Sequence, residues 1–83
     1  MKILLTARLQ APASETLFRE VDWPGVPPME AYVEYEQDWG LSAIAHIYLF
    51  LNGRAEVGLK TRFSEEEMTT LLGTGHWSNQ PPP

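Results

Sequence analysis

Cysteine is absent from this 83-residue chain. Without thiols, the protein can form neither a disulfide framework nor a thiolate metal site. Histidine is scarce as well, and its two positions, His46 and His76, lack the spacing of a pair of metal ligands. We therefore expect no metal and no other cofactor. A small domain without cysteine fits a reducing compartment, so we expect a cytoplasmic protein.

Long hydrophobic runs are also missing. The longest covers residues 47–51, far short of the roughly 20 residues that span a membrane. The first ten residues, MKILLTARLQ, are interrupted by Thr6 and Arg8, which is not typical of a signal peptide. We expect no membrane contact, one small domain over residues 1–77, and a disordered tail that ends in prolines over residues 78–83.

Basic residues are few. Six Lys and Arg stand against eleven Asp and Glu, which gives a formal net charge of −5. This balance argues against nucleic acid as a partner, because binding to phosphates requires Lys and Arg. Residues 20–38 contain acids and no base; the acids are Glu20, Asp22, Glu30, Glu34, Glu36 and Asp38. We interpret this acidic segment as a solvated surface, with attraction of a basic partner and imitation of nucleic acid as the alternatives.

Catalytic signatures are lacking too. The serines stand in predicted loops or caps without a nucleophile motif, and the glycines are scattered as turn residues instead of forming a phosphate-binding loop. Glu34 and Glu36 share a strand face and could form a carboxylate pair, but adjacent acids on one strand face are more often solvated. We predict no catalytic residue and a protein that is not an enzyme.

Strand patterning is what the chain does contain. Residues 2–10 alternate between apolar and polar side chains, which predicts a half-buried strand. Residues 16–23 are compatible with a short helix capped by Ser14 or with a strand. We favour a strand that pairs with residues 2–10, because a proline-glycine break follows too soon for a stable helix. Residues 30–36 are predicted to form a further strand.

The Asn-Gly dipeptide at residues 52–53 separates two β-rich runs, residues 43–51 and 54–62, and predicts a hairpin with a two-residue loop. In that register Leu51 opposes Arg54, and one face of the hairpin is apolar on both strands. The reverse face of residues 43–51 is apolar as well. We therefore expect this strand to be covered on both sides.

A helix is predicted over residues 65–72. Ser64 and Glu67 have the spacing of a capping box at its start, and Gly73 is a suitable residue to end it. The predicted fold is therefore an α+β domain: a four- to five-stranded, mainly antiparallel sheet with one short C-terminal helix packed on it.

Aromatic residues are numerous for a chain of this length. We predict that Trp23 and Tyr48 lie in the core, where each would bury a large area. Trp39, in the acidic loop EQDWG, is equally suited to an exposed contact with a partner. His46 stands among apolar residues and is predicted to be a hydrogen-bonded histidine of the core or of an interface. Trp77 is predicted to fix the tail to the domain.

Two segments, LFREVDWPGVP at residues 17–27 and LNGRAEVGLK at residues 51–60, resemble small uncharacterised accessory proteins of actinobacteria and their phages. The resemblance implies a compact, β-rich accessory protein and brings no activity with it. Small acidic phage proteins without cysteine commonly bind and block a host protein. The resemblance therefore implies a protein partner.

From these features we predict a non-enzymatic, acidic binding protein that is encoded by a phage and binds or inhibits a host protein. The residues predicted to contact the partner are Trp39, Glu34, Glu36 and Asp38. The alternative is a self-assembling, homodimeric structural protein with residues 43–51 at the interface. Its predicted interface residues are Ile47, Leu49 and Leu51. A third interpretation is a small hydrolase or ligand-binding domain that uses His46 with Tyr48.

Overall fold

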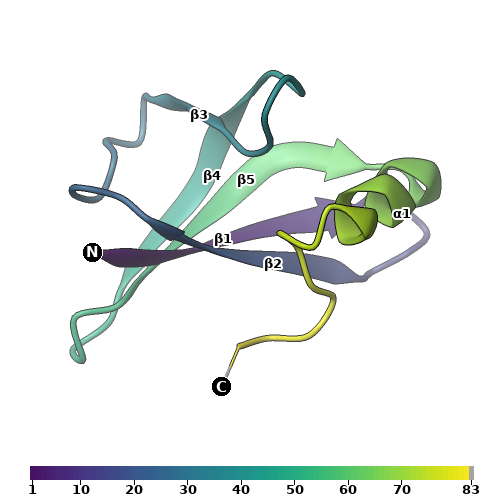
Figure 1. Ribbon diagram of the computed structural model, residues 1–83. Helices are drawn as coiled ribbons and strands as arrows, with labels where there is room; N and C mark the ends of the chain where they lie inside the picture. The colour runs from purple at the N-terminus through teal and green to yellow at the C-terminus, as the bar shows by residue number, and fades with distance from the viewer. Residues whose placement is uncertain (83) are drawn as a thin grey trace.

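A five-stranded sheet in the order β2-β1-β5-β4-β3, followed by one short helix, makes up most of the protein (Figure 1). The computed structural model describes residues 1–82. The elements are β1 (Lys2–Leu9), β2 (Thr16–Asp22), β3 (Tyr32–Glu34), β4 (Leu41–Leu49), β5 (Ala55–Phe63) and α1 (Glu65–Gly73). β1 and β5 are parallel and the other three pairings are antiparallel, so the sheet is mixed. Five strands and a C-terminal helix agree with the prediction, but β3 is shorter than the predicted residues 30–36, and α1 includes Gly73 and ends at the C-cap Thr74. The parallel pairing was not predicted.

The N-terminal strand β1 lies inside the sheet, not at its edge. Its alternation places Ile3, Leu5 and Ala7 on the inner face, where all three are buried. On one side β1 pairs with β2 as an antiparallel hairpin, which confirms a strand in the region predicted at residues 16–23. On the other side β1 runs parallel to β5. The first and last strands of the sheet in sequence order are therefore neighbours.

The hydrophobic core lies on one face of the sheet, and α1 closes one end of it (Figure 1). Every strand and the helix contribute to this core, which explains why so short a chain can bury one. At the centre of the core, Phe63 is fully buried, and the centroid of its ring lies 5.2 Å from the centroid of the Tyr35 ring. The buried apolar residues are Ile3, Leu5, Ala7, Leu9, Leu17, Val33, Tyr35, Ile44, Ala55, Val57, Leu59, Phe63, Leu71 and Trp77.

The helix α1 begins as predicted. The Ser64 hydroxyl accepts a hydrogen bond from the Glu67 backbone N–H, and the Glu67 carboxylate accepts one from the Ser64 N–H, so the capping box is confirmed. Leu71 is the helical residue that becomes buried. Within residues 1–82, no helix has both the length and the apolar character needed to cross a membrane.

The hairpin of β4 and β5 corrects the predicted register. Phe50 N–H donates to the Arg54 carbonyl over 2.9 Å, and Gly53 N–H donates to the Phe50 carbonyl over 3.0 Å. The loop therefore has three residues, with Gly53 at a φ of 84° closing a type I turn as a bulge. Because the loop is one residue longer than predicted, Phe50 faces Arg54 and every pair near the turn shifts by one residue: Leu49 faces Ala55, Tyr48 faces Glu56 and Ile47 faces Val57.

The predicted double covering of residues 43–51 is wrong. Ile44 is buried and Ile47 is half-buried, but the strand runs out beyond the core towards the turn. Leu49 is 72% exposed and Tyr48 is 52% exposed, so the predicted core position of Tyr48 is wrong as well. Because the loop is longer, each residue of β4 near the turn has a different cross-strand partner on β5 from the one predicted. An apolar hairpin end is therefore left in water.

The chain after α1 returns to the open side of β2. Trp77 is 4% exposed, and Ser78 exchanges two backbone hydrogen bonds with Phe18, of 2.7 and 2.9 Å. Trp77 therefore fixes this segment as predicted, and Ser78 is attached to the sheet. The disorder predicted for residues 78–83 stays a prediction. Pro83, the last residue of this tail, lies outside the described residues.

Candidate functional site

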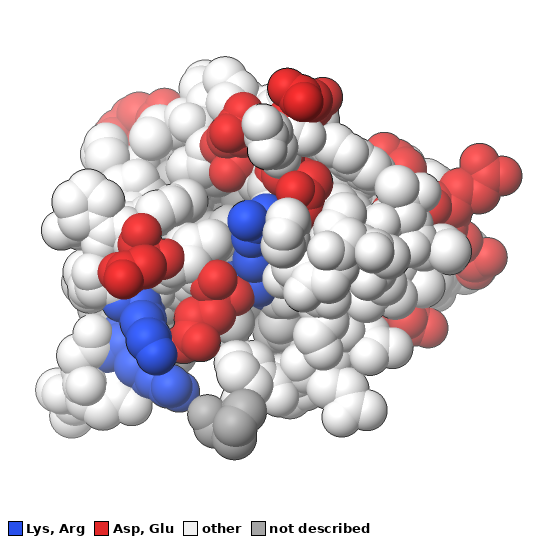
Figure 2. All heavy atoms as spheres, in the orientation of Figure 1, with Lys and Arg blue, Asp and Glu red and all other residues white. Residues whose placement is uncertain are grey.

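A hollow of about 500 Å³ lies between β2 and the segment that follows β3. Three of the four residues predicted to contact a partner, Glu34, Glu36 and Asp38, line it. The other lining residues are Arg19, Val21, Trp23, Gln37 and His76. On the face drawn in Figure 2, basic atoms lie in a central hollow with acidic atoms close by. The structure thus brings the predicted acids together and adds a guanidinium and an imidazole to them.

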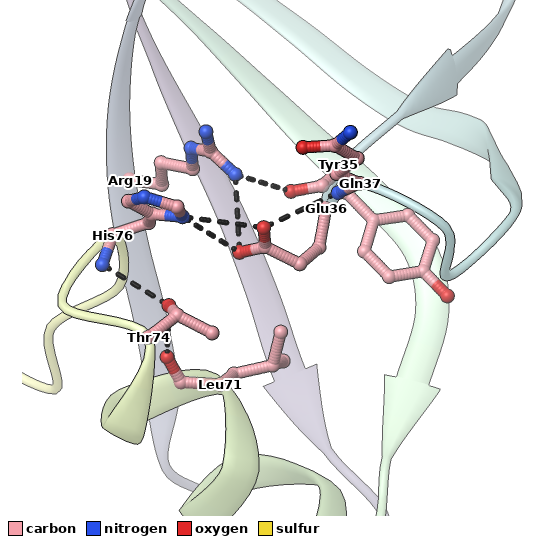
Figure 3. Close-up of polar contacts among 7 residues, drawn as sticks. All are labelled: Arg19, Tyr35, Glu36, Gln37, Leu71, Thr74 and His76. Carbon is pink, nitrogen blue, oxygen red and sulfur yellow. Dashed lines mark hydrogen bonds and ion pairs between the residues drawn. The ribbon is translucent and has the colours of Figure 1, made fainter.

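Glu36 is the polar centre of this hollow (Figure 3). Its side chain is only 6% exposed, and it forms an ion pair with Arg19, whose Nη1 lies 3.2 Å from Oε1. The same Nη1 donates to the Tyr35 carbonyl over 2.9 Å. The Nδ1 atom of His76 lies 3.2 Å from both carboxylate oxygens. Glu36 therefore joins β2, the end of β3 and the C-terminal segment.

The charge of Glu36 is retained although the side chain is buried. Burial acts to raise the pKa of the carboxyl group, but hydrogen bonds from His76 and from the Gln37 N–H, together with the charge of Arg19, lower it further than burial raises it. The resulting pKa lies below the ordinary value of 4.5. At neutral pH Glu36 is thus an ionised, buried anion with its partners in place.

A tight turn presents the neighbouring acids to solvent. Trp39 N–H donates to the Glu36 carbonyl over 3.1 Å, and Asp38 has a φ of 67°, a conformation that Asp and Asn tolerate better than most residues. Asp38 and Glu34 are both exposed. Neither forms an ion pair with any other residue of the described chain. Their two carboxylates are therefore available at the rim of the hollow.

Trp39, the fourth predicted contact residue, does not line the hollow. It is half-buried and packs edge-on against Phe63, with ring centroids 6.5 Å apart. The Tyr35 hydroxyl donates to its backbone carbonyl over 3.2 Å. The indole therefore packs against the core, and the aromatic residue that lines the hollow is Trp23.

Arg19 and His76 are the two lining residues with a basic side chain, and neither was predicted as part of a site. Arg19 interrupts the apolar alternation of β2, which is the one sequence signal that pointed to an inward charge. His76 had no such signal. Its position depends on the burial of Trp77 beside it and on Thr74, whose hydroxyl accepts from the His76 N–H over 3.1 Å. The hollow can hold a positive group at its rim, and no set of three His or carboxylate side chains within residues 1–82 could hold a metal ion.

The histidine of the hairpin has a separate environment. The ring of His46 stacks on that of Tyr48 with centroids 4.3 Å apart, and its Nε2 lies 3.0 Å from a carboxylate oxygen of Glu56. The imidazole also covers Gly58 so closely that any side chain at this position would collide with the ring. His46 is thus hydrogen-bonded, as predicted, but its side chain is 30% exposed and lies outside the core cluster. A role at an interface stays a prediction. The predicted interface residues Ile47, Leu49 and Leu51 belong to this hairpin and not to the hollow.

Comparisons with models of known protein families, with curated proteins and with solved structures find no match for this chain. The resemblance to accessory proteins of actinobacteria and their phages therefore stays a prediction.

Proposed function

We propose that this protein is a non-enzymatic binding protein whose hollow receives a positively charged side chain of a protein partner. The observation that supports this best is the pair of exposed carboxylates, Glu34 and Asp38, at the rim of the hollow without ion-pair partners in the described chain. Arg19 balances the charge of Glu36. The charge left uncompensated at the rim is therefore negative, and a cation is the complementary group.

The wall of the hollow suits an arginine or lysine side chain. Trp23 and Val21 contribute apolar surface, along which the methylene groups of such a side chain can lie. The face of a tryptophan ring also attracts cations. The acidic balance of the whole chain, with a formal charge of −5, would speed the encounter with a basic partner. By analogy with the phage proteins that the sequence resembles, we propose that the partner is a host protein. This chain would then be a phage-encoded, cytoplasmic inhibitor of that protein.

A binding role fits Glu36 better than a catalytic one. A general acid or base works best when its pKa lies near the working pH, whereas the pKa of Glu36 is lowered below its ordinary value. Both of its oxygens are also engaged by Arg19, His76 or the Gln37 N–H. In the binding role that we propose, Glu36 fixes the positions of Arg19 and His76 and neutralises the charge of Arg19.

The test is a titration of the full chain with the peptide acetyl-Gly-Arg-Gly-amide, followed by the backbone amide NMR shifts of the hollow. We expect weak, saturable shifts at Glu34, Asp38 and Trp23 that diminish as salt rises from about 0.05 to about 0.5 M. The same peptide with neutral citrulline in place of arginine is the ligand control. Shifts spread over the whole surface, or equal shifts with citrulline, would contradict the proposal.

The matched protein variants separate the rim from the overall charge. Glu34→Gln combined with Asp38→Asn removes both free carboxylates, and asparagine tolerates the φ of 67° at residue 38. We expect this variant to fold and to lose the shifts. Glu65→Gln combined with Glu66→Gln removes the same charge from the exposed start of α1 and is expected to bind as the wild type does. Equal binding by the two double variants would contradict a specific hollow.

A further inference from the structure

One edge of β4 is open. β3 pairs with β4 only from Leu41 to Ala43, and β4 continues to Leu49. Over residues 44–49 the strand has β5 on one side and no strand of the described chain on the other. A row of backbone N–H and C=O groups is therefore presented to solvent, as at any unprotected sheet edge.

The turn determines which backbone groups point outward. Phe50 and Arg54 form a hydrogen-bonded pair, and hydrogen-bonded and non-hydrogen-bonded pairs alternate along an antiparallel ladder. Tyr48 therefore bonds to β5, whereas the N–H and C=O groups of Ile47 and Leu49 point to the open edge. No backbone hydrogen bond from either residue to a turn, loop or cap occurs within residues 1–82.

This edge lacks the features that usually prevent strand pairing. Residues 44–51, IAHIYLFL, contain no proline, no lysine and no carboxylate, the residues with which natural edges are protected. A bulge interrupts the ladder between Ile44 and His46, but beyond it the pairing is regular up to Leu49. Tyr48 and Leu49 are large apolar residues of this stretch that are exposed, at 52% and 72%.

We propose that β4 pairs in antiparallel fashion with β4 of a second copy of this chain, about a two-fold axis that passes beside Tyr48. Ile47 of each copy then forms a hydrogen-bonded pair with Leu49 of the other, which satisfies all the outward backbone groups of both residues. The two Tyr48 residues face each other as a non-hydrogen-bonded pair. The two sheets become one continuous sheet across the dimer.

A second copy fits this edge for two reasons. An antiparallel strand pair is self-complementary, so a two-fold dimer brings the same surface from both chains. In the register centred on Tyr48, residue 51 of one copy lies opposite residue 45 of the other. In each copy, β3 covers its own β4 only from Leu41 to Ala43. The hairpin turn of the other copy then ends just before this β3. The open edge and the incoming strand thus have matching lengths.

The interface is limited to one strand pair and the adjoining hairpin ends. Interfaces below about 1,200 Å² are typical of weak or transient complexes. We therefore expect a reversible dimer with a dissociation constant in the micromolar range. This surface is separate from the hollow, so Glu34→Gln combined with Asp38→Asn is expected to leave the dimer intact.

Sedimentation velocity of the full chain over about 1 to about 200 µM is the first test, a range that brackets the affinity expected for an interface of this size. We expect the mass to rise from the 9.4 kDa monomer to twice that value. Leu49→Lys is expected to raise the dissociation constant at least tenfold, because a charge on the edge opposes pairing. Leu41→Lys is the control, since Leu41 is also solvent-exposed, at 63% against 72% for Leu49, but lies where β3 already pairs. A wild type that stays monomeric throughout, or equal dimerisation of both variants, would overturn the proposal.

A disulfide tests the register. The chain has no cysteine, so Tyr48→Cys introduces a single thiol. Residues that face each other in a non-hydrogen-bonded pair have Cα atoms about 4.5 Å apart, within the range that a disulfide spans. We expect Tyr48→Cys to form a covalent dimer rapidly under mild oxidation and Leu41→Cys to remain a monomer on denaturing gels. Equal rates for the two variants would exclude a two-fold axis at Tyr48.

Discussion

Glu36 is a buried carboxylate that stays ionised. Its Oε1 faces Arg19, its oxygens are both within 3.2 Å of the Nδ1 atom of His76, and the Gln37 N–H adds a third partner. Buried ion pairs of this kind are costly to break, because one partner is left without its counter-charge. At the scale of single residues, Glu36 is thus the point at which three separate parts of the chain depend on one another.

Glu36→Gln should destabilise the protein by about 2 kcal/mol. The substitution leaves Arg19 without its carboxylate partner, and the partial exposure of Arg19 and His76 keeps the loss below that of a fully buried pair. The measurement is urea unfolding at neutral pH. Glu34→Gln, an exposed neighbour two residues away, is the control and should change the free energy of unfolding by less than about 0.5 kcal/mol. Similar losses for the two variants would contradict the central role of Glu36.

The pH dependence of stability should also depend on Glu36. Because its pKa is lower in the folded chain than the ordinary value of 4.5, the unfolded chain takes up a proton first as the pH falls. The stabilising contribution is therefore complete above the unfolded pKa and is lost as the pH falls through the folded pKa. We expect the wild type to lose stability more steeply than Glu36→Gln between about pH 5 and about pH 3. Parallel pH profiles of the two proteins would show that other groups dominate.

The site could be predicted from the sequence only where its residues are close together in the chain. Glu34, Glu36 and Asp38 alternate within one short segment, and they do line one hollow. Arg19 and His76 reach the same hollow from distant positions, so their proximity follows from the tertiary fold. No pattern within one segment contains that information.

At the scale of elements, the β4–β5 hairpin shows how one residue of loop length changes a surface. Asn-Gly is common in two-residue turns, where both residues have positive φ, but glycine also closes three-residue loops as a bulge. The structure uses the second form, with Gly53 at a φ of 84°. The alternation of β4 could therefore be predicted, whereas its register depended on a choice between two turn types that the same dipeptide permits.

Gly53→Ala should destabilise the protein by about 1 kcal/mol, because alanine is strained at positive φ. Gly73→Ala is the matched comparison: Gly73 is the last residue of α1, and no heavy atom beyond its chain neighbours and the adjacent helix backbone lies within 4 Å of a Cβ placed there. We expect Gly73→Ala to stabilise the protein by about 0.5 kcal/mol through a better helix propensity. Thermal unfolding of both variants measures the difference. A neutral or stabilising Gly53→Ala would contradict the three-residue loop.

At the scale of the whole molecule, the order of the sheet could not be predicted from strand patterns. β1 with β2, β3 with β4 and β4 with β5 are each consecutive in sequence and paired, and those pairings follow from short loops. β2 and β3 are consecutive as well, but they lie at opposite edges of the sheet. The parallel pairing of β1 with β5 joins the strands that are farthest apart in the sequence. The antiparallel bridge between Ser78 and Phe18 also joins segments that are far apart in the sequence. Both depend on the complete set of core contacts and not on any local signal.

Trp77→Ala should destabilise the protein by about 3 kcal/mol or more, because a large buried side chain is removed from the core. Trp77→Phe should cost less, since it keeps most of the buried area and removes the indole N–H, a buried donor without a partner in the described chain. Deletion of residues 79–83 should change the free energy of unfolding by about 0.5 kcal/mol or less. Urea unfolding measures all three. A deletion as costly as Trp77→Ala would show that the last residues, and not Trp77, hold the C-terminal segment.

The parallel pairing of the first and last strands also governs when this sheet can fold during synthesis. β1 leaves the ribosome before the other strands, yet one of its two neighbours, β5, is translated after all of them. Contacts between such distant segments slow folding, because a large loop must close before they form. The N-terminal strand β1 therefore lacks one of its two neighbours until β5 has emerged, and the native sheet can assemble only from that moment.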